Sequence, residues 1–115
     1  MENKFELLHI GINCENADES LKLAELLSAV FNLAPRQGNK SNFAGTYFEC
    51  MKAPFHGANG HVAMGTADLD AAVAELKEKG WSFKEETAAY TEDGKLKNIY
   101  IDAEFGGFAI HIMRK

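Results

Sequence analysis

The chain has 115 residues, of which 46% are hydrophobic and 25% charged, the composition of one soluble globular domain. Its formal net charge of −5 disfavours nucleic acid or an anionic membrane as the main partner, although a local positive site can still bind a small anion. No stretch approaches the roughly 18 apolar residues of a membrane span, and the polar start "MENKFELLHIGIN" is unlike a signal peptide. We therefore expect a cytoplasmic protein.

The chain begins with a predicted strand and a predicted helix. Residues 5–13, "FELLHIGIN", are an apolar run with β-branched isoleucines, typical of a buried strand. In the following "NADESLKLAELLSAVF", Asn16 and Glu19 have the spacing of a capping box, and apolar residues then recur at helical intervals. The helix is expected to bury a face made by Leu23, Leu26, Leu27 and Val30, with Leu21 and Ala24 supporting it.

The next segment leads to a boundary between two halves of the chain. The loop-rich "NLAPRQGNKSN" has room for a short strand, and the aromatic-rich residues 43–52, "FAGTYFECMK", are predicted to form a strand. Residues 53–60, "APFHGANG", contain proline, two glycines and asparagine, which indicates a connection. We place the boundary there, with a first module over about 4–53 and a second over about 60–115 of a single domain, 1–115.

After the boundary the order of elements repeats. "HVAMGT" is a predicted strand, and "ADLDAAVAELKEKG" a helix that ends at Gly80. "WSFKEETAAY" and "LKNIYIDAEF" are predicted as two strands around the "TEDGK" turn, whose Asp-Gly pair is a hairpin signal. "GFAIHIM" is the last strand. The helix presents one apolar face, made by Leu69, Val73 and Leu76.

The two halves can be aligned by residue. "LLHIGIN" lies over "NGHVAMG", which pairs His9 with His61. "GTYFECMK" lies over "GGFAIHIMR", which pairs Glu49 with His111. In the first half, His9 and Glu49 are 40 residues apart (49 − 9). In the second half, His61 and His111 are 50 residues apart (111 − 61), so ten extra residues lie in the second half's middle hairpin.

Strand alternation indicates which neighbours share a face with the histidines. His9 shares its face with Leu7 and Gly11, and the residues beside the other two strand histidines include Ala63 and Ala109. This face is therefore small or polar and leaves room for a bound group. The opposite faces carry large apolar side chains, where we expect the helices to pack: Leu8, Ile10, Ile12, Val62, Met64, Ile110 and Ile112.

Four residues at repeat-equivalent positions form a candidate metal site. Three of the four histidines, His9, His61 and His111, occupy equivalent strand positions, and Glu49 takes the fourth. If the halves pair into one sheet, imidazole nitrogens and a carboxylate converge, a donor set that suits one divalent transition metal: Zn, Ni, Co, Mn or Fe. Calcium or magnesium would need more oxygens. Two other readings stay open: a metal-free polar pocket, and unrelated structural roles.

The motifs "LLHIGIN", "YFECM", "GHVAMGTADLDAAVAELKEKG" and "GGFAIHI" resemble the vicinal oxygen chelate superfamily, which includes glyoxalase I, bleomycin- and fosfomycin-resistance proteins and extradiol dioxygenases. The resemblance covers essentially the whole chain. It implies a glyoxalase-like α+β fold, in which two βαβββ modules form one curved mixed sheet around a central cleft. It also implies a homodimer. The superfamily's ligands, from the first and last strands of each module, map onto His9, Glu49, His61 and His111.

More narrowly, the chain is similar to a small glyoxalase-like domain attached to some bacterial 2-keto-3-deoxy-6-phosphogluconate aldolases. One position departs from the glyoxalase pattern, because "GFAIH" places His111 where those members usually have glutamate. Glu49 is then the only carboxylate of the four, and it would have to be ligand, base or both. The departure argues against lactoylglutathione lyase activity.

Two functional hypotheses follow from the resemblance. The first is a divalent-metal-dependent lyase or isomerase that acts on a small, anionic, oxygenated metabolite, with Glu49 as the base. The second is a non-catalytic metabolite-binding or accessory domain of sugar-acid metabolism, which the missing second carboxylate favours. An iron-dependent dioxygenase is a third class, but a fourth protein ligand at His111 would crowd its oxygen site.

Several other residues have weaker functional claims. His56 can line a pocket mouth, Asn13 can support the site, and Arg36 and Lys40 can bind a substrate carboxylate or phosphate. For His56, Arg36 and Lys40 a solvated loop is the favoured interpretation. Cys14 and Cys50 have no CxxC spacing and lie in apolar strand contexts, so buried reduced thiols are expected.

Overall fold

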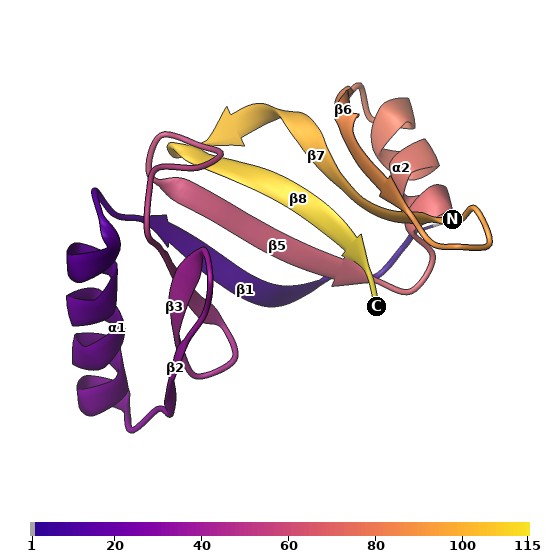
Figure 1. Cartoon of the computed structure of the whole chain (residues 1–115). Helices are drawn as coiled ribbons and strands as arrows, with labels where there is room; N and C mark the ends of the chain where they lie inside the picture. Colours follow the sequence, from indigo (N-terminus) through magenta and orange to yellow (C-terminus); the bar gives the residue numbers. More distant parts are fainter. Residues whose placement is uncertain (1) are drawn as a thin grey trace.

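The computed structural model describes residues 2–115 as one mixed sheet of eight strands with two helices (Figure 1). The first half contains β1 (Glu6–Asn13), α1 (Ala17–Phe31), β2 (Pro35–Gln37), β3 (Ser41–Ala44) and β4 (Phe48–Met51). The second half contains β5 (Gly60–Thr66), α2 (Leu69–Glu78), β6 (Phe83–Tyr90), β7 (Leu96–Phe105) and β8 (Phe108–Arg114). The predicted α+β architecture with a repeated order of elements is therefore confirmed.

The strands follow the order β2-β3-β4-β1-β5-β8-β7-β6. Each half contains one parallel pair, β1 with β4 and β5 with β8, and the antiparallel pairing of β1 with β5 joins the halves. A parallel pair needs a long crossover connection, and each half uses its helix within that crossover. The first strand of each half thus lies at the centre of the sheet.

The strand register supports the residue alignment of the two halves. Gly11 pairs with Glu49 across β1 and β4, and Ala63 pairs with His111 across β5 and β8. Gly11 and Ala63 are also equivalent in the sequence alignment, two positions after His9 and His61. The longer strands β6 and β7 accommodate the extra residues of the second half.

The prediction of one strand over residues 43–52 is wrong. The segment spans two strands, β3 and β4, which pair antiparallel around a turn at residues 45–47. Gly45 has a φ of 65°, in the left-handed region that glycine adopts without strain. The aromatic residues correctly indicated strand on both sides of the turn, but they gave no signal of the chain reversal between the two strands.

The buried face of α1 also differs from the predicted one. Its buried residues are Ser20, Ala24 and Ser28, whereas Leu26 and Val30 are 59% and 58% exposed. The helix lies against the short strands β2, β3 and β4, and the Ser20 hydroxyl donates a hydrogen bond of 2.6 Å to the carbonyl of Cys50. Small residues therefore line the contact, with Leu23 and Leu27 packing at its side.

The capping of both helices follows local sequence signals. Asn16 caps α1 and accepts a hydrogen bond from the amide of Glu19, as predicted. The Glu19 carboxylate, however, accepts from the amide of Glu15 rather than from that of Asn16, so the reciprocal half of the capping box is displaced by one residue. The second helix ends before Gly80, whose φ is 97°.

The larger hydrophobic core belongs to the second half. Leu69 of α2 is fully buried, and Val73 and Leu76 pack around it, as the helical spacing predicts. The cluster of buried residues joins the helix to β6, β7 and β8: Leu69, Phe83, Leu96, Ile99, Ile101 and Ile112. In the first half, Cys14 and Cys50 are buried with Ala24, and burial raises the pKa of the Cys50 thiol to about 11.

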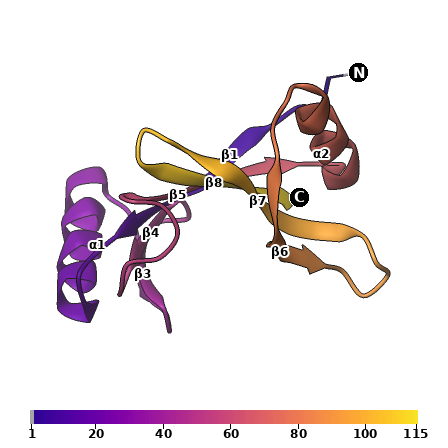
Figure 2. The same cartoon turned by 90° about the horizontal axis from the view of Figure 1, so that it is seen from above.

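The helices lie at opposite ends of an elongated molecule that measures 41 × 26 × 24 Å. Figures 1 and 2 show α1 at one end and α2 at the other, with β1, β5 and β8 between them. The centre of the sheet is therefore where the two halves meet. Within residues 2–115, the helices are too short or too polar to span a membrane.

Candidate metal centre

The pairing of β1 with its two neighbours brings the four predicted residues together. Gly11 is the register partner of both Glu49 on β4 and His61 on β5. Ala63 is likewise the partner of both His9 on β1 and His111 on β8. Directly paired residues point to the same face of a sheet. The four predicted side chains therefore surround two small residues on one face.

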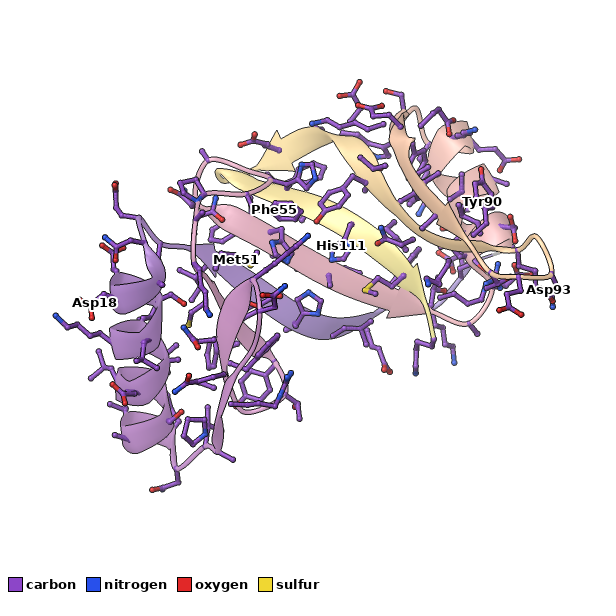
Figure 3. All side chains as sticks on the ribbon, viewed as in Figure 1. Asp18, Met51, Phe55, Tyr90, Asp93 and His111 are labelled. Atoms are coloured by element: carbon purple, nitrogen blue, oxygen red, sulfur yellow. The ribbon has the colours of Figure 1, made fainter. Side chains whose placement is uncertain are left out.

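The distances between these side chains are those of a cluster of ligands. Oε1 of Glu49 lies 3.2 Å from Nε2 of His61 and 3.5 Å from Nε2 of His9. Two ligands at about 2.1 Å from a tetrahedral metal are about 3.4 Å apart, so these spacings fit a common ion. The three histidines have candidate ligand atoms within 4.8 Å of one another, and His111 lies in the middle of the sheet (Figure 3).

Two imidazole nitrogens in this cluster are buried without a hydrogen-bond partner. Among the side chains of residues 2–115, only Ser28 Oγ, His61 Nδ1 and His111 Nε2 are in that condition. His61 is 2% exposed and His111 is 7% exposed. A buried polar atom without a partner is costly and rare, and an ion held by Glu49 and the Nε2 atoms of His9 and His61 would give the free Nε2 of His111 a partner. The residues present fit the divalent metal that the sequence predicts.

The electrostatics keep the imidazoles of His9 and His111 neutral and the Glu49 carboxylate ionised. Burial, together with the charges of the neighbouring imidazoles, lowers the pKa of His111 to about 3. Burial also lowers the pKa of His9, against the opposing charge of Glu49. The hydrogen bond with His61 lowers the pKa of the Glu49 carboxyl. At neutral pH, His9, His111 and Glu49 thus have the protonation states that metal ligands require.

Gly11 is the position at which the site tolerates no side chain. A Cβ atom built there would lie 2.0 Å from Cε1 of His61. The His61 ring therefore lies directly over the backbone of β1, and any larger residue would displace it. The small face predicted around the histidines is confirmed at this position. Strand alternation fails at Leu7, however. A bulge between Leu7 and His9 pairs Leu7 with Met64, while His9 pairs with Ala63. Because Met64 and Ala63 are consecutive residues of β5 and point to opposite faces, Leu7 does not share the face of His9.

Three supporting residues were absent from the sequence prediction. The Ser41 hydroxyl donates a hydrogen bond of 2.9 Å to Oε2 of Glu49. Oδ1 of Asn98 accepts a hydrogen bond from Nδ1 of His111, and this bond leaves Nε2 with the free lone pair. Tyr100 stacks on the His111 ring at 4.6 Å between centroids and 11° between planes. These contacts orient the ring and select its tautomer.

The register of the β7–β8 hairpin explains why Asn98 and Tyr100 were missed. Phe105 pairs with Phe108 at the turn, and a regular continuation along both strands would pair Asp102 with His111. An irregularity in β7 shifts this register and pairs Tyr100 with His111 instead. The only sequence signal was the alternation of "NIYI", which places Asn98 and Tyr100 on the face opposite two core isoleucines.

The weaker candidates have different outcomes. Asn13 does support this region, because its side chain accepts from the Phe55 amide at 3.1 Å and donates to the Gly57 carbonyl at 3.0 Å. It thereby ties the 52–59 connection to β1. His56, on that connection, is half-buried, and its ring lies 4.3 Å from that of Tyr100. It therefore lies beside the cluster rather than in a solvated loop.

Arg36 lies two strands away from Glu49, because it pairs with Phe43 and Phe43 pairs with Glu49. Its guanidinium lies 4.0 Å from the centroid of the Phe43 ring, on the edge pair of strands β2 and β3. This cation–π contact at an exposed site is a packing interaction. Lys40 follows the same loop and lies next to the beginning of β3.

Neither a protein-family model nor a curated protein matches this chain. Solved structures do match its fold. The structure of hypothetical protein BH1468 from Bacillus halodurans C-125 is 14% identical with a TM-score of 0.64, over 97% of this chain and 95% of that one. A single-residue variant of Streptomyces coelicolor methylmalonyl-CoA epimerase, in complex with 2-nitronate-propionyl-CoA, is 17% identical with a TM-score of 0.60, over 95% and 96%.

A different variant of that epimerase with the same ligand is 18% identical with a TM-score of 0.59, over 96% of this chain and 94% of that one. The predicted glyoxalase-like fold is confirmed. At these identities the likeness concerns the fold alone. The particular resemblance to an aldolase-attached domain stays a prediction.

We predict that the Asn98 side chain sets the metal affinity through the tautomer of His111. Replacing Asn98 with leucine removes the acceptor for Nδ1–H, and metal affinity should fall by about 10- to 100-fold. Asn98→Asp keeps an acceptor and should retain most of the affinity. Cobalt titration monitored by absorbance measures the affinity, and ¹⁵N NMR of the metal-free protein identifies the His111 tautomer. Unchanged tautomer and affinity in Asn98→Leu would contradict this role.

Proposed function

We propose that this chain is a divalent-metal-dependent glyoxalase-like enzyme, a lyase or isomerase that acts on a small, anionic, oxygenated metabolite. We further infer that its two modules work as a single domain. One observation carries the proposal: His9, Glu49, His61 and His111 extend from four adjoining strands to one face, with buried imidazole nitrogens left unpaired. Packing alone does not account for unpaired nitrogens at the centre of a sheet.

The four residues would hold the ion, and the metal would supply a Lewis acid that polarises a substrate oxygen. Glu49 is ionised at neutral pH and is the only carboxylate among the four, so it is the best candidate for the base. It would take a proton from the carbon beside a substrate carbonyl and return it, at the same or the neighbouring carbon. The Ser41 hydroxyl holds the carboxylate in place through Oε2.

The epimerase neighbours add support to this reaction class. An epimerase inverts a stereocentre, which a base can achieve by removing and returning a proton at one carbon. The ligand of those structures is a coenzyme A thioester analogue. With identities of 17% and 18%, that ligand is a guide to the choice of probes for this chain rather than to its substrate.

A second candidate function is favoured by the surroundings of Glu49. Oε1 lies next to both His9 and His61, and Oε2 accepts from Ser41, so each carboxylate oxygen already has a protein partner. A carboxylate held in this way suits a ligand more than a mobile base. The chain would then be a metabolite-binding or accessory domain of sugar-acid metabolism, of the kind attached to some aldolases, which binds its ligand without turnover.

Metal content is the first test of both candidates. Protein purified without chelators should contain about one divalent transition metal ion per chain, since the four donors form one site. His111→Ala should lose most of the metal, because it removes a donor and opens the site, whereas His56→Ala should keep it. Elemental mass spectrometry after dialysis measures the stoichiometry. Protein that neither contains nor takes up Zn, Ni, Co, Mn or Fe would exclude the proposal.

Proton exchange separates the enzyme from the binding domain. In deuterated water, the metal-loaded enzyme should exchange the C–H proton beside a carbonyl in a panel of 2-oxo acids, 2-hydroxyaldehydes and acyl thioesters. Glu49→Gln should reduce this exchange by at least about 100-fold, the usual contribution of a positioned general base. Glu92→Gln, on the exposed hairpin turn, is the matched control. Ligand-dependent stabilisation without exchange of any probe would favour the binding domain instead.

We also propose that the chain forms a homodimer, as the resemblance implies. The exposed apolar residues of α1, Leu26, Val30 and Phe31, support a contact between two copies, because each is more than half exposed. Sedimentation velocity should show a dimer at micromolar concentration that Val30→Glu dissociates. A monomer at all concentrations would contradict this expectation.

A further inference from the structure

A hollow beside the candidate metal centre lies at the end of β4, with a cavity volume of about 240 Å³. Phe55 connects it to the centre, because its ring centroid is 5.9 Å from that of His61. Met51 also belongs to it and lies two residues after Glu49 on β4, on the same face. The hollow is lined by Lys40, Met51, Lys52, Ala53, Pro54 and Phe55.

The two lysines of the hollow lie opposite each other in the backbone register, and neither has an ion-pair partner in the described part of the chain. Ser41 pairs with Met51 across β3 and β4, and one position further the amide of Lys52 donates to the carbonyl of Lys40 at 3.0 Å. Like charges placed opposite each other across strands are destabilising. Neither lysine takes part in the ion pairs found among residues 2–115, and the lining of the hollow contains no carboxylate.

This arrangement differs from that of the ion-paired lysines. Among residues 2–115, Lys22, Lys77, Lys79 and Lys115 each lie beside a carboxylate. Lys40 and Lys52 instead line a hollow whose other lining residues are apolar: Met51, Ala53, Pro54 and Phe55. An anion between the ammonium groups would relieve their repulsion, and a short apolar chain would cover the side chains beside them.

We propose that this hollow binds the anionic tail of the substrate, a terminal carboxylate or phosphate on a short apolar chain. The other, oxygenated end of the same molecule lies at the metal centre, on the His61 side of the hollow. This orientation rests on the proposed function, whereas the anion site depends only on Lys40, Lys52 and the apolar lining. The substrate is therefore bifunctional, with a metal-chelating end and a charged tail.

The anion site is tested in the metal-free protein. Pentanoate and pentyl phosphate are titrated against ¹⁵N-labelled protein, with pentan-1-ol as the uncharged control, and the better of the two anions identifies the tail. Amide signals of residue 40 and of residues 51–53 and 55 should shift with the anions but not with the alcohol. The double variant Lys40→Met, Lys52→Met should abolish these shifts, while Lys97→Met, which changes an exposed lysine of β7, should keep them.

Equal shifts with the alcohol, or unchanged anion shifts in the double variant, would overturn the proposal. The double variant is expected to fold, because it removes a like-charge pair at the surface. Its melting temperature should be at least that of the parent protein. Lys40→Glu is an independent check, since it would pair with Lys52 and block anion binding without removing both charges.

The metal-loaded protein tests the orientation of the substrate. Oxaloacetate, 2-oxoglutarate and 2-oxoadipate are compared with the monoacids of equal chain length, 2-oxobutanoate, 2-oxopentanoate and 2-oxohexanoate. At the length that reaches the hollow, the diacid should bind about fivefold more tightly than its monoacid, and the double lysine variant should remove that preference. Equal affinities at every length would overturn the proposed orientation, even if metal uptake upholds the proposed function. Failure to take up metal would overturn the proposed function, and the metal-free titration would still decide the anion site.

Discussion

The antiparallel pairing of β1 with β5 is the constraint on which the rest of the molecule depends. Its register places Gly11 opposite His61 and Ala63 opposite His9, so each half supplies a small residue where the other supplies an imidazole. A slip of one residue would turn one strand's set of side chains to the opposite face and disperse the cluster. The parallel pairs in each half then add Glu49 and His111 to the same face.

Burial of the imidazoles affects both their protonation state and the stability of the metal-free protein. Desolvation keeps His9 and His111 neutral, and the side-chain oxygen of Asn98 fixes which nitrogen of His111 is free. The same burial leaves His61 Nδ1 and His111 Nε2 without partners, which reduces the stability of the metal-free protein. A bound ion would remove part of that cost, so metal binding and folding stability are expected to be coupled.

The two halves contribute unequally although their topology is the same. The second half has long strands, a core built around Leu69 and the residues that orient His111. The first half has short strands and a contact of small residues beneath α1, and it contributes Glu49 and the two opposed lysines. The half with the larger core thus presents two of the three imidazoles, while the half with the smaller core presents the candidate base and the proposed tail site.

The sequence by itself determined the repeated order of elements, the N-cap of α1 at Asn16, the face of α2 around Leu69 and the four converging residues. These features depend on local periodicity and on the equivalence of the halves, which a single sequence contains. The tertiary structure alone decided the turn at Gly45, the exposure of Leu26 and Val30, and the partners of His111. An irregularity in β7 changed which residue faces that histidine, and the close packing of α1 on the short strands selected small residues over leucines. Local patterns carry no information on such shifts, because they depend on how strands of unequal length fit together in one sheet.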